Sequence, residues 1–218
     1  MKKGLTELVF VIDESGSMYD LTQDTIGGFN SAIDRQKQTD GEVYVSTILF
    51  NDRSRMLHDR LPLSDVQSMT ESDYHASGCT ALVDAMGSSI RHIRNIHKYA
   101  RNEDVPEHTV FIITTDGMEN ASHIWTAAEV RQMVEVQKDK YGWEFVFLAA
   151  NIDAAETAAR YGIDSSRAVN YRNDSHGTRL KFKAVGNAVD ACRMNVPLEE
   201  SGWKDELEED YLSRPEVC

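Results

Sequence analysis

The chain alternates between short apolar runs and longer stretches in which apolar residues recur every three or four positions. A short run without a polar face is typical of a strand that is buried on both sides, as in a parallel sheet. A spacing of three or four is typical of a helix with one buried face. The predicted strands lie at residues 6–12, 43–50, 109–115, 143–149 and 167–171, with residues 53–59 as a short antiparallel edge strand.

Helical segments fall between these strands. The predicted helices are 22–38, a long one after Thr80, one from Thr126 to Lys140, one that begins at Asp153, and 178–193, with one or two helical turns inside 64–73. Thr126-Ala-Ala-Glu129 has the spacing of a capping box, in which each end residue bonds to the backbone of the other. Strands that alternate with helices predict an α/β fold, with a doubly wound, mostly parallel central sheet flanked by helices.

The last segment differs in composition from the rest. A chain of 218 residues is long enough for one α/β domain, which we place at residues 1–196. Residues 197–218 carry eight acidic side chains against Lys204 and Arg214, and we expect a weakly ordered acidic C-terminal tail there. Part of this tail has side chains large enough to dock on the domain, namely Trp203, Leu207, Tyr211 and Leu212.

Charge and cysteine content narrow the class of protein. The formal net charge of −13 disfavours nucleic acid and anionic membranes as partners, and no apolar run approaches the length of a membrane span. Three cysteines, Cys79, Cys192 and Cys218, are an odd and sparse set. Such a set is not a disulfide framework and favours a reducing compartment. We therefore expect a cytoplasmic protein.

A candidate binding loop follows the first predicted strand. Asp13-Glu-Ser15-Gly-Ser17 places one carboxylate and two hydroxyls at alternating positions, and the glycine allows a sharp turn. Short side chains with oxygen atoms suit a hard cation such as Mg²⁺. Because open α/β sheets bind ligands beyond the carboxyl ends of their strands, this loop lies where a site is expected.

Two further segments complete the pattern. Ser77-Gly-Cys79-Thr80 precedes the long helix, and Asp116-Gly117 follows the apolar run 110–113. In this order, the three segments resemble the metal-ion-dependent adhesion site (MIDAS) of the von Willebrand factor A (VWA) family, over residues 5–195. The chain departs from the family at Cys79, where relatives often have glycine. The five ligand positions of the motif fall on Asp13, Ser15, Ser17, Thr80 and Asp116.

The resemblance implies both a fold and a function. In the family, the strands that lead to the two aspartates are neighbours, and the site holds Mg²⁺ or Mn²⁺. The two serines bind the ion directly, whereas Thr80 and Asp116 would exchange between direct and water-mediated contact. A carboxylate from a partner protein completes the shell of the ion. The expected function is therefore a metal-dependent protein-binding adaptor that is not an enzyme.

Residues near the motif also have expected roles. Asn120 is expected to bond to loop backbone, and Asn51 and Asp52 to line the rim of the site. His75 and Cys79 share a loop but lack further ligands for zinc. A scaffold with a degenerate site is disfavoured by the complete ligand set.

The alternative function is Mg²⁺-dependent phosphoryl transfer of the haloacid-dehalogenase type, which also uses aspartates at strand ends. That chemistry needs an acid two residues after the nucleophile, where this chain has Ser15. It also needs a lysine near the second acidic loop, and none is evident in the sequence.

Overall fold

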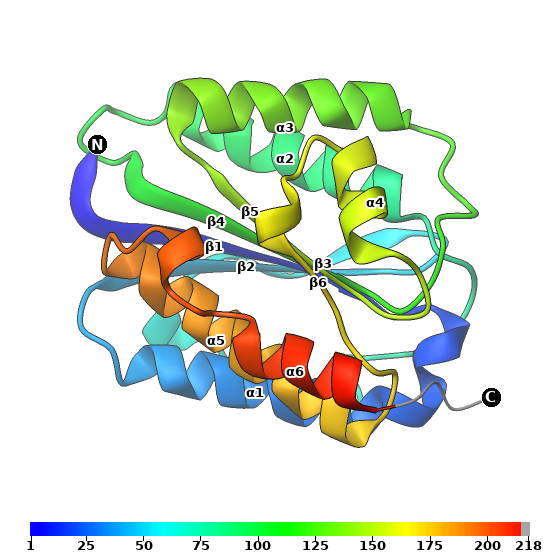
Figure 1. The fold of residues 1–218 in the computed structure, drawn as a ribbon. Helices are drawn as coiled ribbons and strands as arrows, with labels where there is room; N and C mark the ends of the chain where they lie inside the picture. The colour runs from blue at the N-terminus through cyan, green and yellow to red at the C-terminus, as the bar shows by residue number, and fades with distance from the viewer. Residues whose placement is uncertain (215–218) are drawn as a thin grey trace.

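The computed structural model describes residues 1–214, which form a six-stranded sheet between two layers of helices (Figure 1). The strands are β1 (Lys2–Asp13), β2 (Glu42–Phe50), β3 (Ser54–Pro62), β4 (Pro106–Thr115), β5 (Glu144–Ala149) and β6 (Ala168–Asn170). Their order in the sheet is β3-β2-β1-β4-β5-β6. All neighbouring strands are parallel except β2 and β3, which are antiparallel. The predicted fold class and its antiparallel edge strand are confirmed.

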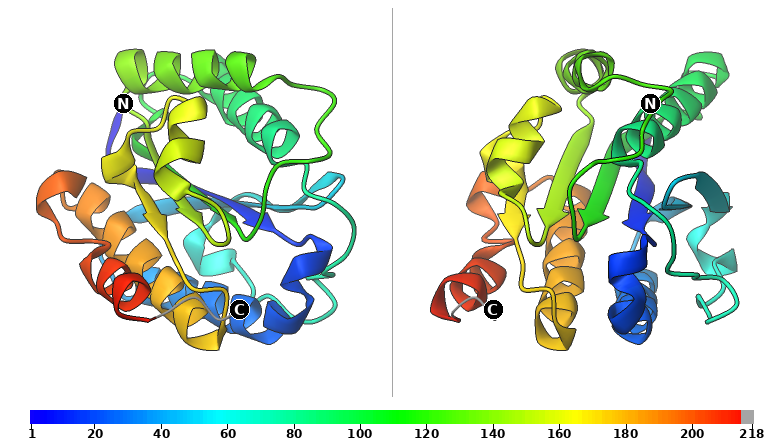
Figure 2. Two further views of the ribbon diagram at one scale, coloured as in Figure 1. Left: turned by 45° about the vertical axis from the view of Figure 1, so that its right-hand side comes forward. Right: turned by 90° about the vertical axis from the view of Figure 1, so that its right-hand side faces the viewer.

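The helices divide between the two faces of the sheet (Figures 1 and 2). They are α1 (Thr22–Lys37), α2 (Leu82–Tyr99), α3 (Ala127–Tyr141), α4 (Ala154–Arg160), α5 (Ser175–Arg193) and α6 (Asp205–Ser213). Short 3₁₀ turns connect them at η1 (Gly16–Leu21), η2 (Leu63–Asp65), η3 (Ser165–Arg167) and η4 (Leu198–Glu200). None of the helices in residues 1–214 is long and apolar enough to cross a membrane.

The first strand shows why its apolar run has no polar face. Leu8, Phe10 and Ile12 belong to the core under α1 and α5. Val9 and Val11, which alternate with them, belong to the core under α2 and α3. A central parallel strand is covered by helices on both faces, so both sets of side chains are buried.

Local capping signals set several helix boundaries as predicted. The Thr126 side chain accepts the backbone N–H of Glu129, the Glu129 carboxylate accepts the N–H of Thr126, and α3 ends in the left-handed Gly142. Asp153 caps α4 by accepting the backbone N–H of Glu156. Helix α5 starts at Ser175, earlier than the predicted residue 178, because Asp174 accepts the N–H of Gly177.

The expectation of a weakly ordered tail is wrong for its described part. Leu198, Trp203 and Leu207 are at most 3% exposed and belong to the core on the α1–α5 side of the sheet. Helix α6 packs on α5, whereas Leu212 is 81% exposed. The burial of these apolar side chains stabilises the segment despite its charge. Cys218 and Glu216, which the sequence analysis counted, lie outside the described residues.

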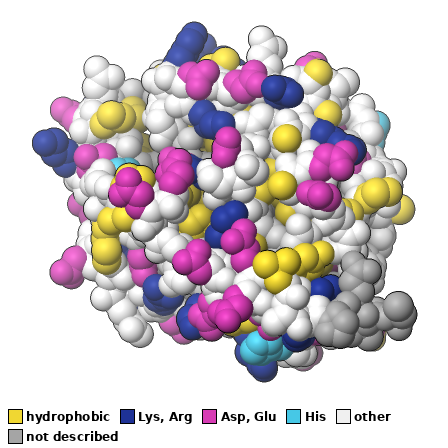
Figure 3. All heavy atoms as spheres, viewed as in Figure 1, with side chains coloured by type: hydrophobic (Ala, Val, Ile, Leu, Met, Phe, Trp, Pro, Cys, Tyr) yellow, Lys and Arg dark blue, Asp and Glu magenta, His cyan; other side chains and the backbone are white. Residues whose placement is uncertain are grey.

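Several acidic side chains of this segment are paired with basic groups. Glu206 lies 2.5 Å from Lys183 on α5, and Asp210 lies 2.5 Å from Arg214. Figure 3 shows that acidic and basic side chains are interspersed over the face it presents. The acidity of the chain is therefore spread over this face and not gathered into a single patch.

Candidate metal centre

The candidate site lies where the direction of winding of the sheet reverses. β1 and β4 are parallel neighbours, with Ile12 beside Thr114, so the loops that follow them lie together at the carboxyl edge of the sheet. This edge is on the right in Figure 1 and faces the viewer in the right panel of Figure 2. Such a reversal leaves a crevice between adjacent loops, which is the usual place for a ligand in open α/β sheets.

The loop after β1 is organised around the Asp13 carboxylate. Its Oδ1 accepts the backbone N–H of Ser15 at 2.8 Å, and its Oδ2 accepts the Thr115 hydroxyl at 2.6 Å. The hydroxyl oxygens of Ser15 and Ser17 are 3.2 Å apart. Asp13 and Ser15 are buried, whereas Ser17 is exposed, so the loop presents its oxygen atoms toward solvent at one end.

Asp116 joins this group from the loop after β4. Its Oδ1 accepts the Ser17 hydroxyl at 2.7 Å. Its Oδ2 is 3.3 Å from the Nδ2 of Asn173, and its backbone oxygen accepts the Asn151 amide at 2.9 Å. Four of the five predicted ligands, including both aspartates, are thus connected by hydrogen bonds or by the contact between the serine hydroxyls.

Thr80 is held beside this group by backbone contacts. Its N–H donates to the Asn120 side chain at 2.9 Å, and its carbonyl accepts the Asn120 N–H at 3.0 Å. The expected role of Asn120 as a backbone-bonding residue is confirmed. The carbonyl of Gly78 accepts the N–H of Gly16 at 3.1 Å, which joins the Thr80 loop to the first loop. Within the described chain, no hydrogen bond connects the Thr80 hydroxyl to the other four candidate ligands.

Gly78 and the rim residue Asp52 are packed closely together. Gly78 has φ of +76°, and a Cβ atom there would lie 2.4 Å from an Asp52 carboxylate oxygen. The neighbouring Asn51 carbonyl accepts the N–H of Ala81 at 2.7 Å. The loop after β2 therefore borders the Thr80 loop, in the place expected for the rim.

An ion pair between the buried Glu14 and the partly exposed Arg55 supports the first loop. Glu14 lies within the candidate motif, and its carboxylate accepts two hydrogen bonds from Arg55, at 3.0 and 2.8 Å. It also accepts the N–H of His75 at 3.2 Å. The Glu14 side chain is 4% exposed. A two-pronged pair of this kind fixes geometry as well as charge, so Glu14 connects the first loop to β3 and to the segment before Thr80.

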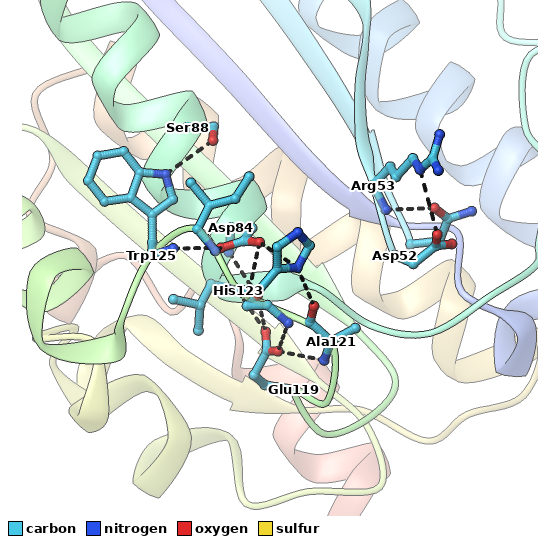
Figure 4. A network of polar contacts seen from close by, with 12 residues as sticks. Asp52, Arg53, Asp84, Ser88, Glu119, Ala121, His123 and Trp125 are labelled. Carbon is cyan, nitrogen blue, oxygen red and sulfur yellow. Dashed lines mark hydrogen bonds and ion pairs between the residues drawn. The ribbon is translucent and has the colours of Figure 1, made fainter.

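Two carboxylates hold the loop after β4 against the start of α2 (Figure 4). The Asp84 carboxylate accepts the backbone N–H groups of residues 123–125 at 2.8–2.9 Å. Glu119 accepts the N–H of Val83 at 2.8 Å, and the Ser122 hydroxyl accepts the N–H of Asp84 at 3.0 Å. The first turn of α2 is thus capped by a loop almost forty residues further along the chain.

Burial governs the electrostatics of the site. It raises the pKa of the Asp13 carboxyl above its ordinary value, against the opposing effect of hydrogen bonds from Ser15 and Thr115. Tyr171 donates its hydroxyl to the Thr115 carbonyl at 3.2 Å, and burial followed by the charges of Asp116 and Asp13 raises its pKa well above the ordinary value. Two buried carboxylates in neighbouring loops favour a cation, because each disfavours the charge of the other.

A buried lysine accompanies the aspartates. The Lys181 ammonium is fully buried, without a hydrogen-bond partner in residues 1–214, and lies 4.6 Å from the centre of the Tyr171 ring. Burial lowers its pKa to about 8, although the carboxylates of Asp116 and Asp13 favour its charged form. The expectation that no lysine lies near the second acidic loop is therefore wrong.

The donor set suits a hard cation better than zinc. In residues 1–214, no three side chains of His, Cys, Asp or Glu converge so that they could hold a metal ion. The candidate site accordingly contains two carboxylates, and its remaining oxygen atoms belong to hydroxyl groups. Carboxylate, hydroxyl and water oxygens are ligands of Mg²⁺ and Mn²⁺. The buried oxygen of the Asn173 amide also lacks a hydrogen-bond donor within the described part. A water molecule bound to the metal would supply such a donor.

No family model and no curated protein matches the chain. Solved structures, in contrast, do match the chain. A von Willebrand factor type A protein from Catenulispora acidiphila is similar with 16% identity and a TM-score of 0.56, over 86% of this chain and 42% of that one. The chain has the fold of a VWA domain.

Other solved structures share the fold. Proximal thread matrix protein 1 from the mussel byssus, with a zinc-occupied MIDAS motif, has 16% identity and a TM-score of 0.59, over 88% of this chain and 46% of that one. A mutant of the PilB minor pilin from Streptococcus sanguinis has 10% identity and a TM-score of 0.57, over 99% of this chain and 64% of that one. The chain spans less than two thirds of the length of each of these three proteins.

Several residues of the site were missed by the sequence analysis. Glu14, Asp84, Glu119, Asn173 and Lys181 act through contacts with residues distant in the chain. The available signals were weak: a second acid inside the Asp13 motif, and a Glu-Asn pair after Asp116-Gly117. A lysine within the amphipathic α5 gave no signal at all, because charged residues on a helix are usually exposed.

Proposed function

We propose that this chain is a metal-dependent protein-binding module of the cytoplasm, which holds Mg²⁺ or Mn²⁺ and captures an acidic side chain of a partner protein. Asp13 and Asp116 would supply the charge at the ion, and Ser15, Ser17 and Thr80 would supply hydroxyl oxygens. The partner carboxylate would occupy the position left open toward solvent. The ion would polarise and anchor that carboxylate, and the protein would orient it.

One observation carries the proposal. The loops of two aspartates that are far apart in the sequence meet at the exposed Ser17, whose hydroxyl donates to Asp116 and lies 3.2 Å from the Ser15 hydroxyl beside Asp13, while both carboxylates are buried. Buried carboxylates without a cation in contact are unfavourable, so the arrangement favours an ion that enters from the Ser17 side. The zinc-occupied MIDAS of proximal thread matrix protein 1 supports a metal in this fold.

Metal binding can be tested through stability. At a hundredfold excess over its Kd, an ion that binds only the native state stabilises it by about 2.7 kcal/mol, which raises Tm by about 5–10 °C in a chain of this size. We expect such a rise with Mg²⁺ or Mn²⁺ and its loss in Asp13→Ala. The matched control is Asp139→Ala, which removes an exposed aspartate of α3.

The expected outcome separates metal binding from general salt effects. Asp139→Ala should keep the full rise in Tm, and Asp13→Ala should remain folded without it. A folded wild-type protein whose Tm does not change in millimolar Mg²⁺ or Mn²⁺ would contradict the metal site. Equal shifts in both variants would place the ion elsewhere.

Phosphoryl transfer is the second candidate, and Lys181 is the observation that favours it. A lysine near two aspartates can neutralise charge on a transferred phosphoryl group. Ser15 still stands where that chemistry needs an acid, so we propose that the chain is not an enzyme of this type. Hydrolysis of a chromogenic phosphate ester that disappears in Asp13→Asn would establish the enzyme instead.

A further inference from the structure

Large apolar side chains are exposed on both loops that supply the aspartates. Tyr19 follows Ser17 by two residues, and Met118 follows Asp116 by two residues. Their exposed fractions are 72% and 71%. Exposed aromatic and methionine side chains are enriched where one protein contacts another. Each residue is thus two positions along the chain from a candidate ligand, one on each of the two loops that supply the aspartates.

Both side chains are carried by segments with fixed backbones. Tyr19 lies in η1, between the buried residues Met18 and Leu21. Met118 precedes Glu119, whose carboxylate holds the loop on α2 together with Asp84. A partner that covers these side chains therefore does not have to order the backbone that carries them, and this favours affinity.

The surrounding charge restricts the partner. The chain has a net charge of −13, and the loops next to the site carry the exposed acids Asp20 and Asp52. The exposed Arg53 lies 3.9 Å from Asp52, so the positive charge of Arg53 is partly neutralised by Asp52. A stretch of several acids would be repelled at this edge, whereas a single acid at the metal would not.

We propose that Tyr19 and Met118 form an apolar rim that selects a partner segment with one acidic side chain between large apolar side chains. The metal takes the single carboxylate, and the rim takes the apolar neighbours. The inference rests on the proposed function, because it assigns the partner chemistry of the same site. It adds that the two rim side chains discriminate among acidic partners.

The test uses the full chain and three fluorescent five-residue peptides in Mg²⁺, with binding followed by anisotropy. Each peptide has a central aspartate, and its neighbours are two leucines, two serines or two glutamates. We expect the leucine peptide to bind about tenfold more tightly than the serine peptide, from burial of its apolar side chains. The glutamate peptide should bind most weakly.

Two variants assign the effect to the rim. The double variant Tyr19→Ser with Met118→Ser should bind the leucine peptide no better than the serine peptide. The matched control is Tyr99→Ser, which removes a side chain that is 79% exposed at the far end of α2. It should keep the full preference for leucine.

The outcomes distinguish this inference from the function on which it rests. Equal, metal-dependent binding of the leucine and serine peptides would overturn the rim and leave the metal site intact. A preference for leucine that survives the double variant would also overturn it. If no peptide binds in Mg²⁺ although the Tm rises, the capture of a carboxylate itself fails. Metal-dependent dimerisation of the chain, measured by sedimentation, would make a second copy the partner.

Discussion

The two loops that supply the aspartates are stabilised in different ways. Asp13 organises its own loop through the N–H of Ser15, two residues away. The loop after β4 is instead held by Asp84, which precedes it by about forty residues and accepts the N–H groups of residues 123–125. The first loop is thus organised by an aspartate that is itself a candidate ligand, whereas the second is held by a carboxylate that is not.

This difference indicates which residues matter for metal binding and which matter for the stability of the fold. In the first loop, Ser15 and Ser17 are candidate ligands, and their hydroxyls are not needed to cap a helix. In the second loop, Asp84 and Glu119 satisfy backbone N–H groups and are not themselves ligands. We therefore expect changes in the first loop to affect metal binding most, and changes in the supports of the second loop to affect the free energy of unfolding most.

The largest expected effect is that of Asp84→Ala. It removes a buried carboxylate that accepts three backbone hydrogen bonds. Hydrogen bonds to charged groups contribute about 1.5–3 kcal/mol each, but water can reach part of this loop. We expect the free energy of unfolding to fall by about 3–5 kcal/mol, measured by urea denaturation.

Ser17→Ala is the matched change in the first loop. Without metal, it should alter the free energy of unfolding by less than about 1 kcal/mol, because Ser17 is exposed. With metal, it should remove most of the stabilisation that the ion gives to the wild-type protein. Similar losses of stability in Asp84→Ala and Ser17→Ala would refute the distinction between the two loops.

Lys181 connects the two loops through charge, because Asp13 and Asp116 both favour its ammonium form. Burial nevertheless lowers its pKa to about 8 from an ordinary 10.5. Lys181→Met should therefore raise the free energy of unfolding at pH 7 by roughly 2–4 kcal/mol, since each pKa unit corresponds to 1.36 kcal/mol. Replacement of an unpaired buried charge by an apolar side chain of similar length is favourable.

The pH dependence of this effect has a definite sign. Between pH 8 and 10.5, the unfolded chain still binds the proton that the folded chain has lost. Unfolding therefore takes up a proton, and the contribution of Lys181 to stability rises with pH over this window. The advantage of Lys181→Met should be greatest below pH 8 and disappear above 10.5. Lys183→Met, which removes a half-exposed lysine of the same helix, should show neither effect.

The smallest expected effect is that of Thr126→Ala, which changes the residue at which the second loop ends and α3 begins. Thr126 and Glu129 cap α3 through a reciprocal pair of hydrogen bonds. Loss of such a cap costs about 1 kcal/mol, which thermal unfolding would show as a fall in Tm of about 2–4 °C. A loss as large as that of Asp84→Ala would mean that the cap also supports the loop before it.

The parts of the fold that follow local rules could be predicted from the sequence. The run before Asp13 predicted a strand covered on both faces, and Thr126 with Glu129 predicted the start of α3. The position of Asp13 and Asp116 at strand ends, together with the family resemblance, predicted that they lie together. These features depend on residues close in the chain or on the regular alternation of strands and helices.

The remaining parts depend on contacts that no local pattern encodes. The charge of residues 199–210 suggested disorder, but Trp203 and Leu207 find an apolar surface that only the folded sheet and helices provide. Lys181 gave no indication of burial, since the Tyr171 ring beside it follows β6 and the charges that act on it come from Asp13 and Asp116. Thr80 was expected as a ligand, and its role there stays a prediction.

The separation of the two aspartate loops along the chain has a consequence for how long the folded state persists. Thr115 and Asp13 share a hydrogen bond across 102 residues, and closing a loop of that length costs roughly 4 kcal/mol in chain entropy. Contacts of this range slow folding and form late. An ion that binds only the finished site therefore contributes little to the transition state and slows unfolding instead. Such an ion would extend the lifetime of the native protein without hastening its formation.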